Sequence, residues 1–317
     1  MILLAMRLTA SRIPAIQTFL KVSRAGAFLA LALGGTAVPT RAQSAPPPAN
    51  LVKVVGIENE YQDIANQVGG NRVQTYTILS DPNVDPHLYE SNVDDAKIVA
   101  NADIIIENGV GYDDFADHLM SASPRADRIL LKVQTLTNHQ TGDNPHLWYD
   151  TFNTMPALIP ALVQALSQKD PSGAQFYAAQ GQAFLNSLQQ IQAVCTALKQ
   201  KYSGTPVLGT EPLWNYQAKW CGINMLDAEG PFQKATQDGN DPPAFAVAKF
   251  RDELNNGASK MLMFNDQALT PMSQQMQTLA QANNVPVVAM SETEPPNTTY
   301  QQWMTSQLQA VLQALGG

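Results

Sequence analysis

Two of the four histidines lie in nearly the same short motif. His87 stands in D85-P-H-L-Y-E90, and His146 stands in N144-P-H-L-W-Y149. The proline before each histidine fixes its own φ angle and has no N–H, so each loop is stiff and the direction of the imidazole is set. A neutral imidazole held in this way suits a metal ion. A single such histidine would be interpreted as an ordinary loop residue, but two in the same local frame predict metal ligands.

Other polar and aromatic residues receive simpler interpretations. Tyr89 and Trp148, which follow the two histidine motifs, can enclose the imidazole rings. The remaining histidines are expected to be solvated, His118 on a helix and His139 in a loop. Trp214 and Trp220 are expected in the core.

Carboxylates stand in comparable positions farther along the chain. Glu211 lies in G209-T-E-P-L-W214, and Glu292 and Glu294 lie in S291-E-T-E294 just before two prolines. Like the two histidines, each of them follows a predicted strand, directly or within the next loop. Ligands of open α/β sheets bind beyond the carboxyl ends of the strands. This geometry could therefore bring all these segments to one cleft.

The elements that position these residues alternate between strand and helix. A continuous apolar run of the kind buried on both faces of a sheet predicts a strand at residues 51–57. Further strands are expected at 73–79, 103–107, 128–133, 206–209, 260–264 and 285–290. Between them, helices are expected at 61–68, after a cap at Ser91, at 151–168, after the strand at 206–209 and up to Cys221, at 244–254, at 271–283 and from Tyr300. A polar loop is expected from 227 to 243. This alternation predicts parallel α/β sheets.

A long helix interrupts the alternation near the middle of the chain. From Ser172 to about Lys201 there is no proline, and apolar residues recur mostly at steps of three and four. At 1.5 Å per residue, this helix would span about 45 Å. We therefore expect two doubly wound α/β lobes, at 51–170 and 203–317, joined by a rigid helix at 171–202, with the site in the cleft between the lobes.

The N-terminal 42 residues have the order of a signal peptide. They carry five basic residues and no acid, then a short run rich in alanine and glycine, then T40-R-A42 with small residues at a cleavage site. We expect cleavage after residue 42, a flexible spacer at 43–50, a periplasmic location and no membrane span in the mature protein. Cleavage would change the net charge from −8 to −13.

The composition excludes some functions and leaves the cysteines open. An acidic chain without a basic run does not fit a nucleic-acid-binding protein. No G-x-S-x-G, G-x-x-x-x-G-K-[ST] or H-E-x-x-H motif is present. In an oxidising compartment, Cys195 and Cys221 could form a disulfide, and two buried free thiols are the equal alternative.

Taken together, these motifs resemble the periplasmic metal-binding receptors of ABC transporters, the zinc/manganese TroA-like family. The resemblance covers residues 51–317 and includes the turn N108-G-V-G-Y112. It implies one divalent ion held between two lobes and delivered to a membrane permease by a monomeric binding protein. The ligands it implies are His87, His146, Glu211 and a carboxylate after the last strand. Glu292 is the choice for that carboxylate because it is nearer the strand end, with Glu294 or a site of three protein ligands as alternatives.

The donor set leaves the metal open among Mn²⁺, Zn²⁺ and Fe²⁺. Two imidazoles and two carboxylates form a harder set than three imidazoles and one carboxylate, which favours Mn²⁺, although Zn²⁺ binds more tightly to most sites. The chain also lacks a histidine-rich loop between its first two ligands. One alternative function is a secreted metalloenzyme, since two His and one Glu is also a catalytic zinc set. Another is an adhesion or organic-solute receptor that has lost the metal.

Overall fold

The computed structural model of the chain describes residues 47–81, 83, 87 and 89–316. The predicted signal peptide at 1–42 lies outside these residues, as do 43–46 of the predicted spacer and Asp85, Pro86 and Leu88 of the first histidine motif. Within the described part of the chain, no helix is long and apolar enough to cross a membrane.

The N-terminal lobe is built on a parallel sheet with the strand order β2-β1-β3-β4. Its strands are β1 (Val52–Glu58), β2 (Val73–Leu79), β3 (Ile104–Glu107) and β4 (Ile129–Lys132). All four residues of β3 are buried, and β1 is buried at all but one. Burial of the two central strands explains their high apolar content, because helices cover both faces of a parallel sheet, whereas the edge strands β2 and β4 are only partly buried. The sequence predicted these four strands to within one residue at each end.

Helices of this lobe follow the strands in chain order. They are α1 (Asn59–Gly69), α2 (Val93–Asn101), α3 (Phe115–Ala122), α4 (Val133–Leu136) and α5 (Thr151–Lys169), with short 3₁₀ turns at Gly70–Arg72 and Leu147–Tyr149. The cap of α2 is Asn92, one residue after the expected Ser91. Its side chain accepts hydrogen bonds from the backbone N–H groups of Asp94 and Asp95, and the carboxylate of Asp95 accepts one from the backbone N–H of Asn92. This reciprocal capping box satisfies donors that a helix start would leave unpaired.

The C-terminal lobe repeats the architecture with a sheet ordered β6-β5-β7-β8, again parallel. Its strands are β5 (Pro206–Gly209), β6 (Asn224–Met225), β7 (Leu262–Asn265) and β8 (Val287–Met290), and its helices are α8 (Asn215–Trp220), α9 (Pro231–Gln237), α10 (Ala244–Asn255) and α11 (Pro271–Ala282), with a 3₁₀ turn at Pro212–Trp214. The expected loop from 227 to 243 contains α9. Pro231 at its first position starts the helix without needing an N–H partner, a signal that the loop-like composition obscured.

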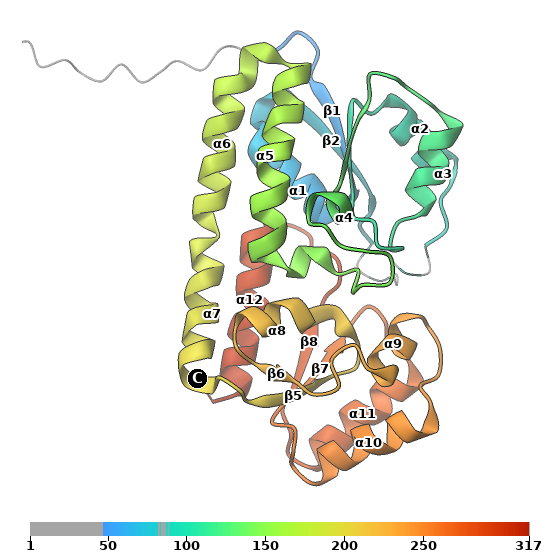
Figure 1. Cartoon of the computed structure of the whole chain (residues 1–317), viewed down its shortest axis with the longest axis vertical. Coiled ribbons are helices and arrows are strands. Elements are labelled where there is room, and N and C mark those ends of the chain that lie inside the picture. Colours follow the sequence, from blue (N-terminus) through green and yellow to red (C-terminus); the bar gives the residue numbers. More distant parts are fainter. Residues whose placement is uncertain (1–46, 82, 84–86, 88, 317) are drawn as a thin grey trace, which may run out of the picture. The chain divides into compact units, whose positions relative to one another are not determined.

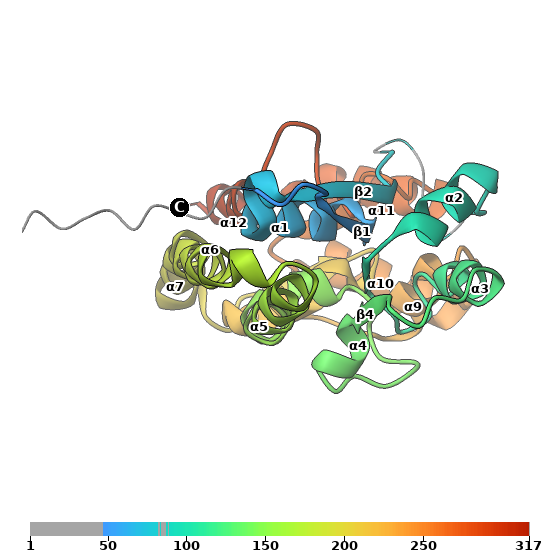
Figure 2. The same ribbon diagram turned by 90° about the horizontal axis from the view of Figure 1, so that it is seen from above.

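The connection between the lobes consists of two helices end to end. A 3₁₀ turn at Pro171–Gly173 leads into α6 (Ala174–Ser187), and α7 (Gln189–Tyr202) follows after the single residue Leu188. The amide of Leu188 bonds Leu185 rather than the residue four back, which interrupts the expected continuous helix by one tight turn. In Figure 1, α6 and α7 run in line, and in Figure 2, viewed along that direction, they overlap. Rigidity of this connection stays a prediction.

The last helix, α12 (Tyr300–Ala314), packs beside α7 and also contacts β8 and α1. It therefore touches both lobes (Figure 1). The main hydrophobic core follows this arrangement, since it joins residues of the first sheet to α5, α7 and α12, while a smaller core around Phe232 and Phe250 lies in the C-terminal lobe. The two sheets are thus held by shared packing as well as by the connecting helices.

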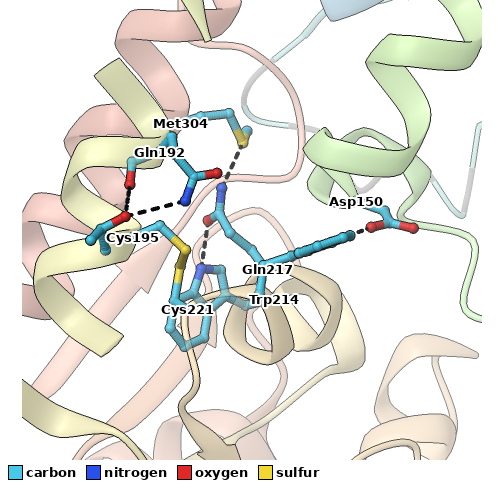
Figure 3. The surroundings of a disulfide bond; sticks show 9 residues. Asp150, Gln192, Cys195, Trp214, Gln217, Cys221 and Met304 are labelled. Atoms are coloured by element: carbon cyan, nitrogen blue, oxygen red, sulfur yellow. Dashed lines mark hydrogen bonds between the residues drawn. A yellow bond between two sulfur atoms is a disulfide. The ribbon is translucent and has the colours of Figure 1, made fainter. Parts of the chain in front are cut away.

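A disulfide ties the connecting helix to the C-terminal lobe. Cys195 of α7 is bonded to Cys221, the residue after α8, and both are buried (Figure 3). Of the two possibilities left open by the sequence, the structure contains the disulfide. Next to it, Trp214 is fully buried and donates to Gln217, as expected for the core. Trp220 was wrongly expected there: it is 44% exposed, and its indole N–H donates to Asp150 of the N-terminal lobe.

A buried ion pair fastens the start of β2 to the connecting segment. Arg72 is 1% exposed and contacts Asp170 at 2.6 Å. Ser172 and Tyr177 also donate to Asp170. Burial opposes the charge of Asp170, but the bonds from Ser172, Tyr177 and Arg72 outweigh it and lower the pKa of the carboxyl.

Candidate metal-binding site

Three of the four predicted ligands meet at one point. His87 and His146 of the N-terminal lobe and Glu292 of the C-terminal lobe place ligand atoms within 4.8 Å of one another. The Nε2 atoms of both histidines approach the same oxygen, Oε1 of Glu292, at 2.9 Å for His87 and 3.0 Å for His146. His87 lies beyond β2, His146 follows β4 through α4, and Glu292 follows β8. The carboxyl edges of the two sheets therefore converge on this cluster.

His146 is held in a fixed orientation by Asn144. The Oδ1 atom of Asn144 accepts the backbone N–H of His146 and lies 2.8 Å from its Nδ1. The amide cannot be turned around, because its Nδ2 donates to the carbonyl of Pro212 at 2.7 Å. Asn144 therefore presents an acceptor to Nδ1, which must carry the hydrogen. The Nε2 lone pair of neutral His146 is then left for the cluster.

Burial favours that neutral form. It lowers the pKa of His146, and the opposing effect of Glu292 is smaller. A neutral His146 would aim the lone pair of Nε2 at a carboxylate oxygen, and two electron-rich atoms repel each other unless a cation or a proton lies between them. A preset tautomer of this kind is typical of histidines that bind metals, whose second nitrogen donates to a carbonyl or carboxylate.

Both carboxylate oxygens of Glu292 make polar contacts. It is fully buried, and Oε1 accepts the hydroxyl of Tyr112 at 3.2 Å in addition to facing the two imidazoles. Oε2 accepts Nδ2 of Asn265 at 2.6 Å. Burial opposes its charge, but the Coulombic attraction of His87 and the close contacts with both imidazoles outweigh burial and hold the pKa of Glu292 well below its usual range. Glu292 is therefore an anion inside the protein.

Glu211 lies beside this group without belonging to it. It follows β5 at the start of the Pro212–Trp214 turn, and it is 5% exposed. Its Oε2 accepts Nδ2 of Asn265 at 2.9 Å, and the same nitrogen reaches Glu292. The side-chain amide of Asn265 thus links Glu211 to Glu292 through two hydrogen bonds. Among the described residues, the group of mutually close ligand atoms contains His87, His146 and Glu292.

Glu294, the alternative to Glu292, is engaged elsewhere. Its backbone N–H and carbonyl both bond the side chain of Asn59. Burial raises the pKa of its carboxyl to about 10, and the acids Asp63 and Glu60 add to this effect. Glu294 is therefore a neutral acid near pH 7, whereas Glu292, two residues earlier, is charged.

Tyr112 is a site residue that sequence reasoning missed. Its ring contacts those of His87, His146 and Trp148, with centroids 4.9, 6.1 and 5.0 Å away. Trp148 lies against His146 as expected, but Tyr89 packs on Phe115, so Tyr112 takes the place foreseen for Tyr89. The motif N108-G-V-G-Y112 was noted only as a turn. Nothing local in it shows that its tyrosine reaches a glutamate 180 residues away.

The turn that delivers Tyr112 is strained and tightly fastened. Gly109, Val110 and Gly111 all have positive φ, and a β-branched residue rarely adopts it. The carboxylate of Asp113 accepts the N–H groups of Asn108 and Gly109, both at 2.7 Å. Strain of this kind persists where surrounding contacts impose it, often at functional sites.

Further buried acids lie around the same turn. Burial raises the pKa of Glu58 well above its usual value, and Asp113 adds to this shift. Burial also raises the pKa of Asp113, to about 6, although its bonds from Gly109 and Asn108 oppose the shift. Glu60 is buried, and its pKa is raised chiefly by burial, with Glu292 contributing.

The other two histidines lie away from the cluster. His118 is exposed on α3, as expected. His139 is half-buried, bonds Thr137 and packs on Tyr216. The two asparagines that orient the site, Asn144 and Asn265, were not predicted as functional. Their role depends on partners 68 and 54 residues away in sequence.

The donor set suits a divalent transition metal. Imidazole nitrogens and carboxylate oxygens are ligands for Zn²⁺ and Mn²⁺, and carboxylates balance the charge of the ion. A protein-family model described as "ZnuA: Zinc-uptake complex component A periplasmic" matches residues 54–314. The chain belongs to this family. The resemblance inferred from the two histidine motifs is thereby confirmed.

Individual members of the family are distant in sequence. The manganese-binding lipoprotein MntA of Halalkalibacterium halodurans is 26% identical over 144 residues, which are 44% of this chain and 47% of MntA. The metal ABC transporter substrate-binding lipoprotein SloC of Streptococcus mutans is 26% identical over 166 residues, 48% of this chain and 53% of SloC. The matched segments thus span about half the length of these two relatives.

Solved structures share the fold. The periplasmic zinc-binding protein TroA of Treponema pallidum superposes with a TM-score of 0.71 at 16% identity, covering 84% of this chain and 100% of TroA. The solute-binding protein FpvC of Pseudomonas aeruginosa, solved with Mn²⁺, gives a TM-score of 0.69 at 17% identity, covering 84% and 98%. The predicted fold class, two parallel α/β lobes of this family, is confirmed.

Proposed function

We propose that the protein is the solute-binding component of a metal ABC transporter, which captures a divalent ion and delivers it to a membrane permease. The observation that carries this proposal is the meeting of His87, His146 and Glu292 from two lobes within 4.8 Å. Glu211 is the fourth candidate ligand, one hydrogen-bonded amide away. Family membership and relatives named as a manganese-binding lipoprotein and as a substrate-binding lipoprotein of a metal ABC transporter support the same function.

The proposal extends to location and partners. The family description names a periplasmic component, and the curated relatives are lipoproteins of metal transporters. These facts support export, with residues 1–42 as the proposed signal peptide and 43–50 as the spacer. A cognate permease is the proposed partner, and a monomer is the proposed functional form.

Burial of the cluster favours transport over catalysis. A catalytic metal keeps one position open to water or substrate. Here His146 and Glu292 are fully buried, and the side chain of His87 is only 15% exposed. A cavity lined by Glu211, Asn265 and Met290 measures about 10 Å³. The space beside Glu211 therefore holds about one water molecule.

The chemistry of the ligands restricts the ion to a few divalent transition metals. Two imidazoles with one or two carboxylates can hold Zn²⁺, Mn²⁺ or Fe²⁺, and Zn²⁺ forms the tightest complexes of the three at most sites. We therefore treat the cargo as a divalent first-row metal, with Mn²⁺ and Zn²⁺ as the leading candidates.

Calorimetry with alanine variants tests the function. His87→Ala and His146→Ala should each abolish tight binding of Zn²⁺ and Mn²⁺. His118→Ala is the matched control, because His118 is an exposed histidine of the same lobe and should leave the affinity unchanged. Wild-type affinity in either site variant would contradict the proposal. Elemental analysis of protein purified from its own periplasm would identify the ion carried.

A further inference from the structure

Asn265 occupies a position between the two carboxylates of the candidate site. It is the last residue of β7 and is 1% exposed. Its Oδ1 accepts the backbone N–H of Gln267 at 3.0 Å, which fixes the orientation of the amide. The nitrogen Nδ2 must therefore face the opposite way, toward Glu211 and Glu292.

Both hydrogens of this nitrogen are engaged by carboxylates. Nδ2 donates to Oε2 of Glu211 at 2.9 Å and to Oε2 of Glu292 at 2.6 Å. An amide nitrogen has two hydrogens, so this pair of bonds uses its full donor capacity. Bonds to charged acceptors are stronger than those between neutral groups. The amide thus holds one oxygen of each carboxylate in the buried interior.

The two oxygens of Glu292 consequently have separate roles. Oε1 faces Nε2 of His87 and Nε2 of His146, while Oε2 faces Asn265. The bond to Asn265 occupies one lone pair of Oε2 and fixes this oxygen on the side of the amide, so that Oε1 is the oxygen turned toward the two imidazoles. If Glu211 behaves in the same way, each of the two carboxylates supplies a single oxygen.

We propose that Asn265 determines metal selectivity by limiting both carboxylates to one-oxygen coordination. This inference rests on the proposed function. It predicts that the preferred cargo is an ion that accepts four ligands, namely two imidazole nitrogens and two carboxylate oxygens. Zn²⁺ is commonly four-coordinate with this donor set. Mn²⁺ prefers six ligands rich in oxygen, which would require both oxygens of a carboxylate or added water. Asn265 therefore favours Zn²⁺ over Mn²⁺, against the preference for Mn²⁺ expected from the number of carboxylates alone.

The test removes the amide and compares metals. Asn265→Ala deletes both donors, and Asn265→Leu deletes them while keeping the branched shape of the side chain. In both variants, the ratio of the Kd for Mn²⁺ to the Kd for Zn²⁺, measured by calorimetry, should fall about tenfold or more, the scale on which supporting residues affect metal sites. Asn215→Ala is the matched control. Asn215 is a buried asparagine of the same lobe whose amide bonds Gln233, and the ratio should stay as in the wild type.

Cobalt serves as a spectroscopic probe of coordination in the same proteins. Co²⁺ bound to the wild type should show the intense visible absorption of a four-coordinate ion. In Asn265→Ala and Asn265→Leu the absorption should weaken as further oxygens bind. An unchanged Mn²⁺/Zn²⁺ ratio with an unchanged cobalt spectrum would overturn the role of Asn265.

The wild-type protein alone can also decide the matter. If the variants do not fold, a weak six-coordinate cobalt spectrum in the wild type would refute the inference, and an intense four-coordinate spectrum would support it. Failure of the proposed function is a different result, since the wild type would then bind neither Zn²⁺, Mn²⁺ nor Co²⁺.

Discussion

Replacing Glu292 by glutamine tests which carboxylate of S291-E-T-E294 serves the site. Glutamine keeps the size of the side chain but removes the charge that both imidazoles approach at 2.9 and 3.0 Å. It also places an amide where Tyr112 and Asn265 now donate to a carboxylate. We expect Glu292→Gln to weaken metal binding at least as much as loss of a supporting residue does, by about 100-fold.

The size of the effect on stability follows from mass action. Metal at 1,000 times the wild-type Kd stabilises the folded protein by about 4.1 kcal/mol. After a 100-fold loss of affinity, the same concentration is ten times the Kd and stabilises it by only about 1.4 kcal/mol. The lost difference of about 2.7 kcal/mol corresponds to about 5–10 °C in the melting temperature of a protein of this size.

The assay is the shift in melting temperature on adding metal, measured for each variant against its own metal-free sample. This comparison removes any effect of the substitution on the protein without metal. Glu294→Gln is the matched control, because Glu294 belongs to the same loop, is 5% exposed and is held by Asn59 outside the ligand group. Its pKa of about 10 means that glutamine replaces an acid already neutral at pH 7. A full metal-induced shift in Glu292→Gln, or its loss in Glu294→Gln, would refute the assignment.

Three further predictions concern the metal and the scaffold. Glu211→His should increase the preference for Zn²⁺ over Mn²⁺ in competition calorimetry, because imidazole is a softer donor than carboxylate; an unchanged ratio would argue that Glu211 does not reach the ion. Cys195→Ser should lower the free energy of unfolding by about 3.5 kcal/mol in denaturant titrations, since the disulfide closes a loop of 26 residues; a loss below about 1 kcal/mol would contradict this. Asp170→Ala should cost about 3–5 kcal/mol at pH 7, because it removes the carboxylate that balances the charge of the buried Arg72. Since the pKa of Asp170 is lowered in the folded protein, its contribution to stability should be complete above about pH 4 and disappear only as the pH falls further. A difference in stability between the wild type and Asp170→Ala that is already lost between pH 6 and 5 would oppose this interpretation.

The sequence was most informative where structure is local. The sequence located β2 and β5 to the residue, because β-branched, aromatic and other apolar residues cluster in both strands between turn-forming residues. Helix α9 and the two-residue β6 were missed, since one resembles a loop in composition and the other is too short for periodicity. The proline–histidine motifs identified His87 and His146 as candidate ligands. Their position after predicted strands, which Glu292 shares, correctly indicated that the three residues lie close together.

Residues that act through distant partners could not be found in this way. Tyr112, Asn144 and Asn265 have ordinary local surroundings, and their meaning depends on contacts between lobes or between strand ends. An asparagine after a strand predicts a turn as readily as a bridge between two carboxylates. Only the folded positions of Glu211 and Glu292 distinguish these possibilities for Asn265.

Asn144 shows that the two lobes are linked at the level of a single ligand. Its oxygen orients His146 in the N-terminal lobe, and its nitrogen bonds the carbonyl of Pro212, the residue after Glu211 in the C-terminal lobe. Tyr216 of α8 in turn donates to the Asn144 carbonyl at 2.8 Å. A displacement of the segment that carries Glu211 would therefore remove the bond that holds the Asn144 amide, and with it the constraint on the His146 tautomer. Because one side chain supports ligands on both sides of the site, loss of contact between the lobes and loss of metal affinity should occur together.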